Sequence, residues 1–163
     1  MHKLINSLQQ SVFIPLRIRG ILLAIFGYDI HSSSRIAEDV YIGSKKLTIG
    51  PNTFVNIKCF LDGCARITLE EGVHLGPFVK ILTGTHSYDI GSVFRRGGAS
   101  VNIHLPVVVE RGSWIGMGAI IMPGVVIGEG CIIGAGSIVL KSTAPNGVYV
   151  GNPAKRIRDL ATT

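Results

Sequence analysis

The stretch "WIGMGAIIMPGVVIGEGCIIGAGSIV", Trp114 to Val139, repeats itself every six residues. An aliphatic side chain recurs at this spacing, and the residue four places after each one is small or β-branched. The aliphatic positions are Ile115, Ile121, Ile127, Ile133 and Val139, and the positions that follow them are Ala119, Val125, Cys131 and Ser137. Helices repeat every 3.6 residues and strands every two. Hexapeptide periodicity instead indicates a parallel β-helix.

A triangular coil explains why six residues form the unit. Each hexad makes one short strand and one corner, so three hexads complete a turn. The leading aliphatic residue points into the prism, while Gly, Asn and Asp supply the corner conformations that other residues resist. Successive turns pair as parallel strands about 4.8 Å apart. We expect about four turns, with both ends of the stack covered.

The same register can be traced upstream, with one slip at "SKKL" and one long break. The leading positions there are Ile36, Ile42, Ile49, Val55, Leu61, Ile67, Val73 and Val79, and the repeat resumes at Val109. Glu71 and Pro77 are exceptions at the small position. The pattern predicts one β-helix domain over residues 31–163, with a protruding loop at about 85–105. Residues 1–30 would cap one end and residues from about 145 to 163 the other.

Composition restricts the class of protein. The chain of 163 residues is rich in Gly (21) and poor in charged residues (16%), which suits a β-rich repeat domain. Its net charge of +6 favours an anionic partner. The aromatic residues are not interleaved with basic ones, which argues against nucleic-acid binding. Cys59 and Cys131 fall at small positions of the repeat and Cys64 has no partner motif, which favours a reducing, cytoplasmic setting.

The N-terminal segment is apolar from Val12 to Phe26 but contains Pro15, Arg17 and Arg19. It is too short and too charged to span a bilayer, which takes about 20 apolar residues. It also lacks the charge order and cleavage site of a signal peptide. We expect one or two short helices that pack on the end of the domain. Contact with a membrane surface through this basic apolar stretch is the alternative.

The loop that interrupts the repeat is the first candidate for function, because long loops in compact repeats commonly carry it. It contains His86, Asp89, Arg95 and Arg96. His86 lies where the coil stops, and histidine is the side chain best suited to accept a proton near neutral pH. Position alone leaves a structural role open for it. His104 ends the loop, either as a partner of His86 or as a bystander.

Read together, "TGTHSYD", "SWIG", "IIMPGV", "IGAGSIV" and "GNPAKRI" resemble the hexapeptide-repeat acetyltransferases, most of all the sugar and galactoside O-acetyltransferases. The resemblance covers roughly residues 30–160. It implies an all-β, left-handed parallel β-helix that forms a homotrimer, with acetyl-CoA bound between neighbouring subunits and no metal required. Acetyl would pass to a hydroxyl of a sugar or of a cell-surface polysaccharide precursor. The enzyme would work in the cytoplasm or at the inner face of the membrane.

Position by position, the resemblance also assigns roles. His86 would be the general base that activates the acceptor, with direct attack on the thioester. Substrate contacts would come from Asn56, Asp62, Asp89 and Trp114. The CoA contacts would come from Gly116, Ala135, Lys141, Lys155 and Arg158, and "KRIR" at residues 155–158 supplies clustered cations for the phosphates. Two departures concern contacts: Leu140 stands where relatives often have a hydroxyl residue, and Cys64 where galactoside enzymes have an acidic one.

Three other functions compete with this interpretation. An N-acetyltransferase of a nucleotide-linked amino sugar would use the same fold and cofactor. A γ-class carbonic anhydrase would need a close histidine pair, whereas His86 and His104 lie eighteen residues apart. A β-helix without catalysis could serve as a scaffold, and His86 at the break argues against it.

Overall fold

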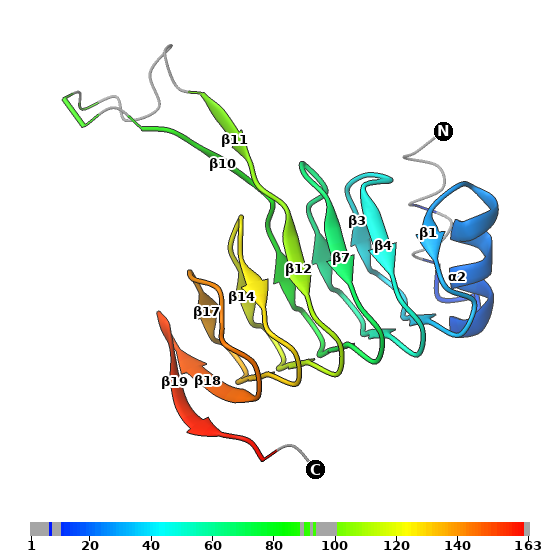
Figure 1. The fold of residues 1–163 in the computed structure, drawn as a ribbon. Helices are drawn as coiled ribbons and strands as arrows, with labels where there is room; N and C mark the ends of the chain where they lie inside the picture. Colours follow the sequence, from blue (N-terminus) through cyan, green and yellow to red (C-terminus); the bar gives the residue numbers. More distant parts are fainter. Residues whose placement is uncertain (1–6, 8–10, 89, 92, 94–100, 162–163) are drawn as a thin grey trace.

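Short parallel strands wind into a three-sided coil in this protein (Figure 1). A computed structural model describes residues 7, 11–88, 90–91, 93 and 101–161 of the chain. The helix α2 lies at the N-terminal end of the coil, and a two-stranded arm projects from the side of the coil. The prediction of a left-handed parallel β-helix is confirmed.

Each side of the prism is a parallel sheet, except where the last strand of the second sheet turns back. The first sheet consists of β1 (Asp29–Ile30), β4 (Leu47–Ile49), β7 (Ile67–Leu69), β12 (Val107–Val109) and β15 (Val126–Ile127). The second sheet consists of β2 (Arg35–Ile36), β5 (Phe54–Val55), β8 (His74–Leu75), β13 (Trp114–Ile115), β16 (Ile132–Ile133), β18 (Gly147–Gly151) and β19 (Ala154–Asp159). The third sheet consists of β3 (Tyr41–Ile42), β6 (Phe60–Leu61), β9 (Lys80–Ile81), β14 (Ile120–Ile121) and β17 (Ile138–Val139).

The repeat sets the register between turns. Ile115 pairs with Ile133, eighteen residues later, so three hexads do complete one turn. The second residue of each two-residue strand is buried, as are the first and third residues of β4, β7 and β12. Together these inward-pointing aliphatic side chains form one continuous core. Among the described residues the first and third sheets each have five strands, and β18 adds a sixth parallel strand to the second sheet, so the coil makes five complete turns and begins another. That is more than the four turns expected, because the coil already begins at β1 and continues into β18.

The traced register was wrong by two residues between Leu61 and the arm. Leu69 and Leu75, rather than Ile67 and Val73, pair with the leading positions of the neighbouring turns. The corner after Leu61 is two residues longer than a hexad allows, and both Ile67 and Leu69 of β7 point inward. Val73 and Val79 therefore fill the small position and are fully buried. Glu71 and Pro77 lie in corners, so they are no exceptions to the rule.

The two ends of the coil differ. At the N-terminal end α2 (Leu16–Ile25) lies beside β1 and β2, and its Arg19 and Leu23 are buried. The Arg19 guanidinium donates hydrogen bonds to the carbonyl oxygens of Ile36, Ser11 and Ile14, at 2.7–2.8 Å. At the C-terminal end β18 and β19 form an antiparallel pair. Within the described chain, α2 is too short to cross a membrane.

Candidate active site

The arm leaves the coil directly after the third sheet. Its strands, β10 (Gly84–His86) and β11 (Asn102–His104), are antiparallel, with His86 opposite Asn102 and Gly84 opposite His104. Side chains directly opposite each other in such a pair lie on the same face. Asp62 and Cys64 from the preceding corner join these residues around a hollow of about 390 Å³. His86 is solvent-exposed at this hollow, so its imidazole is accessible to a bound molecule.

Asp62 fixes the root of the arm. One carboxylate oxygen accepts hydrogen bonds from the Thr83 amide, the Thr83 hydroxyl and the Gly84 amide, at 2.9–3.1 Å. Burial alone would raise the pKa of Asp62, but these bonds and one from the Cys64 thiol outweigh it and lower the pKa. The carboxylate is therefore charged at neutral pH. The three hydrogen bonds fix Thr83 and Gly84, and Gly84 lies two residues before His86.

Cys64 packs closely against the arm. A Cβ atom added to Gly84 would lie 2.9 Å from the Cys64 sulfur, so only glycine allows this approach. Burial raises the pKa of the Cys64 thiol, and the hydrogen bond and negative charge of Asp62 raise it further. The thiol is therefore protonated at neutral pH and a poor nucleophile. Among the residues that line this hollow, His86 and His104 are therefore the side chains that could accept a proton near neutral pH.

A second candidate surface lies on another corner of the prism. The strand register stacks Asn56, Gly116 and Gly134 along the corner between the second and third sheets, with Ala135 next in the chain. A Cβ on Gly116 would lie 2.6 Å from the Ala135 amide nitrogen, so the turns approach closely here. The Asn56 side-chain oxygen accepts a hydrogen bond from the Ile57 amide at 2.8 Å. A single chain thus brings His86 and Asp62 together but leaves Asn56, Gly116 and Ala135 on a different corner.

Trp114 lies on the outer surface of the second sheet, two residues before Gly116. It is directly opposite His74 of β8, and both side chains are exposed. Together they line a shallow hollow beside Gly72 and Gly112. Trp114 is therefore near the corner of Gly116 and not beside His86 of the same chain.

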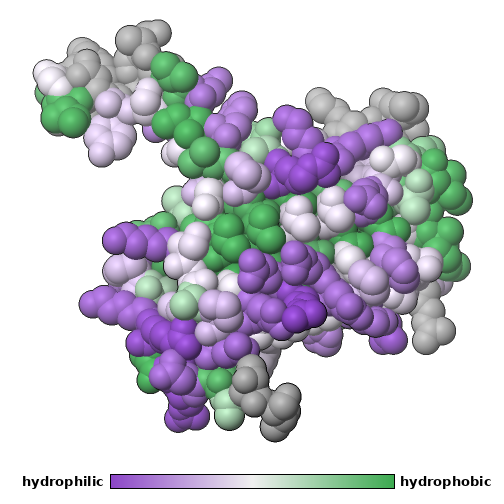
Figure 2. Space-filling model, viewed as in Figure 1, coloured by the Kyte–Doolittle hydropathy of each residue, from purple (hydrophilic) through white to green (hydrophobic). Residues whose placement is uncertain are grey.

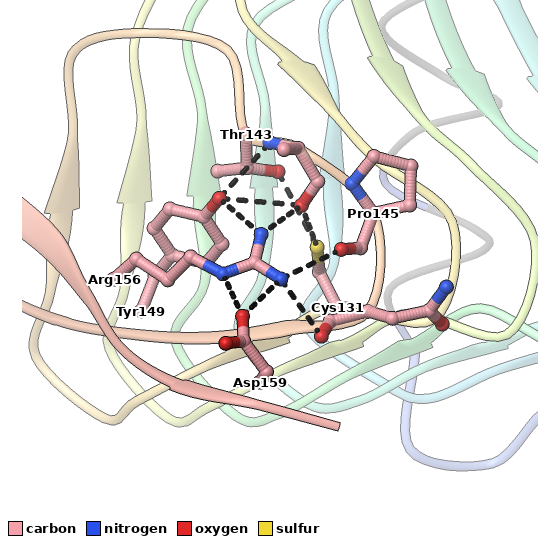
Figure 3. A network of polar contacts seen from close by, with 8 residues as sticks. Cys131, Thr143, Pro145, Tyr149, Arg156 and Asp159 are labelled. Atoms are coloured by element: carbon pink, nitrogen blue, oxygen red, sulfur yellow. Dashed lines mark hydrogen bonds and ion pairs between the residues drawn. The ribbon is translucent and has the colours of Figure 1, made fainter. Parts of the chain in front are cut away.

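The predicted cations of the C-terminal part divide into two groups. Lys141, Lys155 and Arg158 are exposed, the first after β17 and the other two on β19. Arg156, which lies between Lys155 and Arg158 in "KRIR", differs from them in its contacts. Its guanidinium donates to the carbonyl oxygens of three residues, to the Tyr149 hydroxyl and to the Asp159 carboxylate (Figure 3). All its donors are used, so it ties β19 to the preceding loop.

The remaining residues of the loop and the arm differ in how well the sequence predicted them. Asp89, Arg95 and Arg96 lie outside the described residues. Asn102 was missed, because nothing in the sequence indicates which loop residue returns opposite His86. His104, left open by the sequence, lines the same hollow as His86. Among the described residues no group of three or more His, Cys, Asp or Glu side chains is arranged to hold a metal ion.

Comparison with known proteins agrees with this geometry. A model of the bacterial transferase hexapeptide family, six repeats long, matches residues 106–141. A hexapeptide-repeat containing acetyltransferase from Vibrio cholerae has a similar solved structure, with a TM-score of 0.83 and 31% identity, covering 99% of this chain and 89% of that one. The chain belongs to the hexapeptide-repeat acetyltransferase family.

Two further solved structures and one protein sequence are also similar to this chain. The structure of a maltose O-acetyltransferase from Clostridium difficile 630 has a TM-score of 0.88 and 29% identity, covering 98% of this chain and 84% of that one. A second structure of the Vibrio cholerae protein, complexed with acetyl-CoA, has a TM-score of 0.74, 26% identity and coverage of 98% and 89%. A provisionally named acetyltransferase of Schizosaccharomyces pombe is 37% identical over 86% of this chain. The chain spans 66% of the length of that relative.

Proposed function

We propose that the protein is an acetyl-CoA-dependent O-acetyltransferase, which transfers acetyl to a hydroxyl of a sugar or of a cell-surface polysaccharide precursor. The observation that carries the proposal is the exposed His86 at an open hollow, on a strand whose root is held by the Asp62 carboxylate. Two relatives support the choice of cofactor and acceptor. The Vibrio cholerae protein is complexed with acetyl-CoA, and the Clostridium difficile protein is a maltose O-acetyltransferase.

His86 acts as the general base in this proposal. The acceptor O–H bond breaks, its proton passes to an imidazole nitrogen of His86, and the oxygen bonds to the thioester carbonyl carbon. The C–S bond then breaks, and the imidazolium returns its proton to the CoA thiolate. Transfer is direct, without an acyl-enzyme. Holding both reactants in one cleft lowers the entropic part of the barrier, and in this proposal the Asn56 side-chain amide donates to the developing oxyanion.

The acyl carrier needs a smooth surface and fixed cations. Its pantetheine arm carries amides that seek backbone partners, and the close-packed corner of Gly116 and Ala135 offers them without obstructing side chains. The exposed Lys141, Lys155 and Arg158 bind the CoA phosphates. This role accounts for the positive charge of the chain without nucleic acid.

We further propose a homotrimer with its sites between subunits. His86 and Asn56 lie on different corners of one prism, so a site that contains both takes one corner from each of two neighbours. Trp114 then faces the acceptor from the subunit that supplies Asn56. We place the enzyme in the cytoplasm or at the inner face of the membrane.

Thiol release from acetyl-CoA in the presence of maltose, galactosides and other sugars tests the reaction. His86→Ala should lower kcat by about 10²–10⁴-fold, or about 3–5 kcal/mol of barrier, because general base catalysis is lost. His31→Ala, at an exposed histidine far along the chain from the arm, is the matched control and should keep full activity. Equal activity of the two variants would contradict the role of His86.

A further inference from the structure

The outward surface of α2 is apolar, which is the reverse of an ordinary surface helix. Ile18, Ile21 and Ile25, spaced three and four residues apart, form one exposed stripe. The exposed fractions of Ile18 and Ile25 are 52% and 74%. Just before the helix, Phe13 is 90% exposed. Figure 2 shows apolar surface at the end of the molecule where Figure 1 places α2.

The inner side of the same helix holds its polar residue. Arg19 is buried and satisfies carbonyl oxygens of the coil and of the preceding turn. The helix has no acidic residue in its first turn, no basic residue in its last turn and no side-chain N-cap. A ten-residue helix without these local aids is marginal by itself, so packing against its surroundings must stabilise it. A partner that covers the apolar outer stripe would therefore stabilise the helix.

The charge around this stripe selects what covers it. Residues 11–28 contain no Asp or Glu, and the two carboxylates that act on the buried Arg19, Glu38 and Asp39, come from the coil. The exposed Arg35 lines hollows with Leu16 and Ile21 on one flank of α2. At the C-terminal end of the helix the Lys45 ammonium lies 5.9 Å from the centre of the Tyr28 ring. Cations thus flank an apolar stripe on two sides.

We propose that this stripe and its flanking cations dock the protein on an anionic lipid surface, with α2 lying in the plane of the interface. An apolar face that enters the boundary between headgroups and acyl chains, flanked by basic residues, is the pattern of interfacial helices. Each Lys or Arg near an anionic leaflet adds to the attraction. A second copy of the chain fits less well, because a two-fold contact pairs the same patch with itself and sets its cations against each other.

Flotation of the full-length protein with lipid vesicles tests this docking. The protein should float with mixed phosphatidylcholine and phosphatidylglycerol vesicles at low salt, but not with phosphatidylcholine alone. High salt should weaken the binding, since it screens the charges. The double variant Ile18→Ser, Ile25→Ser should lower partitioning by at least about tenfold, which corresponds to about 1.4 kcal/mol. The control Ile157→Ser, 62% exposed on β19 at the other end of the coil, should bind like the wild type.

Phe13→Ser, at a residue that precedes the helix, keeps the test valid if the double variant fails to fold, and it should also weaken flotation. Absence of flotation by the wild type, or equal loss in Ile157→Ser, would overturn the proposal. A smaller assembly mass for the folded double variant would overturn it too, because the stripe would then be a contact between copies. The outcome is independent of acetyl transfer.

Discussion

Asp62→Asn should loosen the root of the arm and misplace His86. In the wild type one Asp62 oxygen accepts three hydrogen bonds, from the amide and hydroxyl of Thr83 and from the Gly84 amide. Asparagine keeps one acceptor oxygen but loses the charge. Hydrogen bonds to a charged group contribute about 1.5–3 kcal/mol and neutral ones about 0.5–1.5 kcal/mol. Because Asp62 is half-buried, the three bonds together should lose about 1–2 kcal/mol.

Hydrogen exchange followed by mass spectrometry measures this loss locally. Peptides that contain Thr83 and Gly84 should exchange about five to thirty times faster in Asp62→Asn, which is the equivalent of that free energy. The kcat of acetyl transfer should fall, because the strand that carries His86 is no longer fixed. Asp29→Asn is the matched control, since Asp29 accepts one hydrogen bond from Thr48 on the exposed first sheet.

The difference in exchange rate between the wild type and Asp62→Asn should also depend on pH. The pKa of Asp62 is lowered in the folded protein, so its contribution to stability is present above the unfolded pKa of about 3.9. It is lost as the pH falls through the folded pKa. The wild type and Asp62→Asn should therefore differ at neutral pH and converge in acid. Unchanged exchange at Thr83 and Gly84 in the variant would refute the assignment of Asp62 as the anchor.

Three other outcomes are expected. Arg156→Ala should lower the midpoint of thermal unfolding, because it removes the hydrogen bonds of Figure 3. Lys155→Ala should weaken CoA binding and leave that midpoint unchanged. The reverse pattern would contradict both roles. Gly116→Ala should destabilise the coil by about 1–3 kcal/mol and weaken CoA binding, because the added Cβ would lie 2.6 Å from the Ala135 nitrogen. Urea unfolding measures the loss of stability, and calorimetric titration measures the loss of CoA affinity. Dialysis against EDTA should leave acetyl transfer intact, and loss of activity that zinc restores would point to a metal enzyme.

Much of the fold could be predicted from the sequence because hexad periodicity has a single geometric explanation. The inward residue of each strand and the small residue near each corner are both local features of the pattern. The register failed only after Leu61, where Ile67 and Leu69 both point inward. Two aliphatic residues at a spacing of two fit either register, and only pairing with β4 and β12 decides between them.

The site was less predictable, because its contacts join residues far apart in the chain. The Asp62 carboxylate meets the Thr83 amide across twenty-one residues, through one turn of the coil. The letters "KRIR" do not reveal that the Arg156 guanidinium packs against the Tyr149 ring. The buried Arg19 follows the same rule, since its partners are carbonyl oxygens that no side-chain pattern encodes.

Calorimetric titration of the purified protein with CoA and acetyl-CoA, together with the mass of the assembly, tests whether the coil binds an acyl carrier. We predict a trimer that binds about one CoA per chain with a dissociation constant on the order of micromolar. Lys141→Ala and Lys155→Ala should weaken that binding. A well-folded protein that gives no heat with either ligand would contradict the account, because the corner of Gly116 and Ala135 would then not be a site for an acyl carrier.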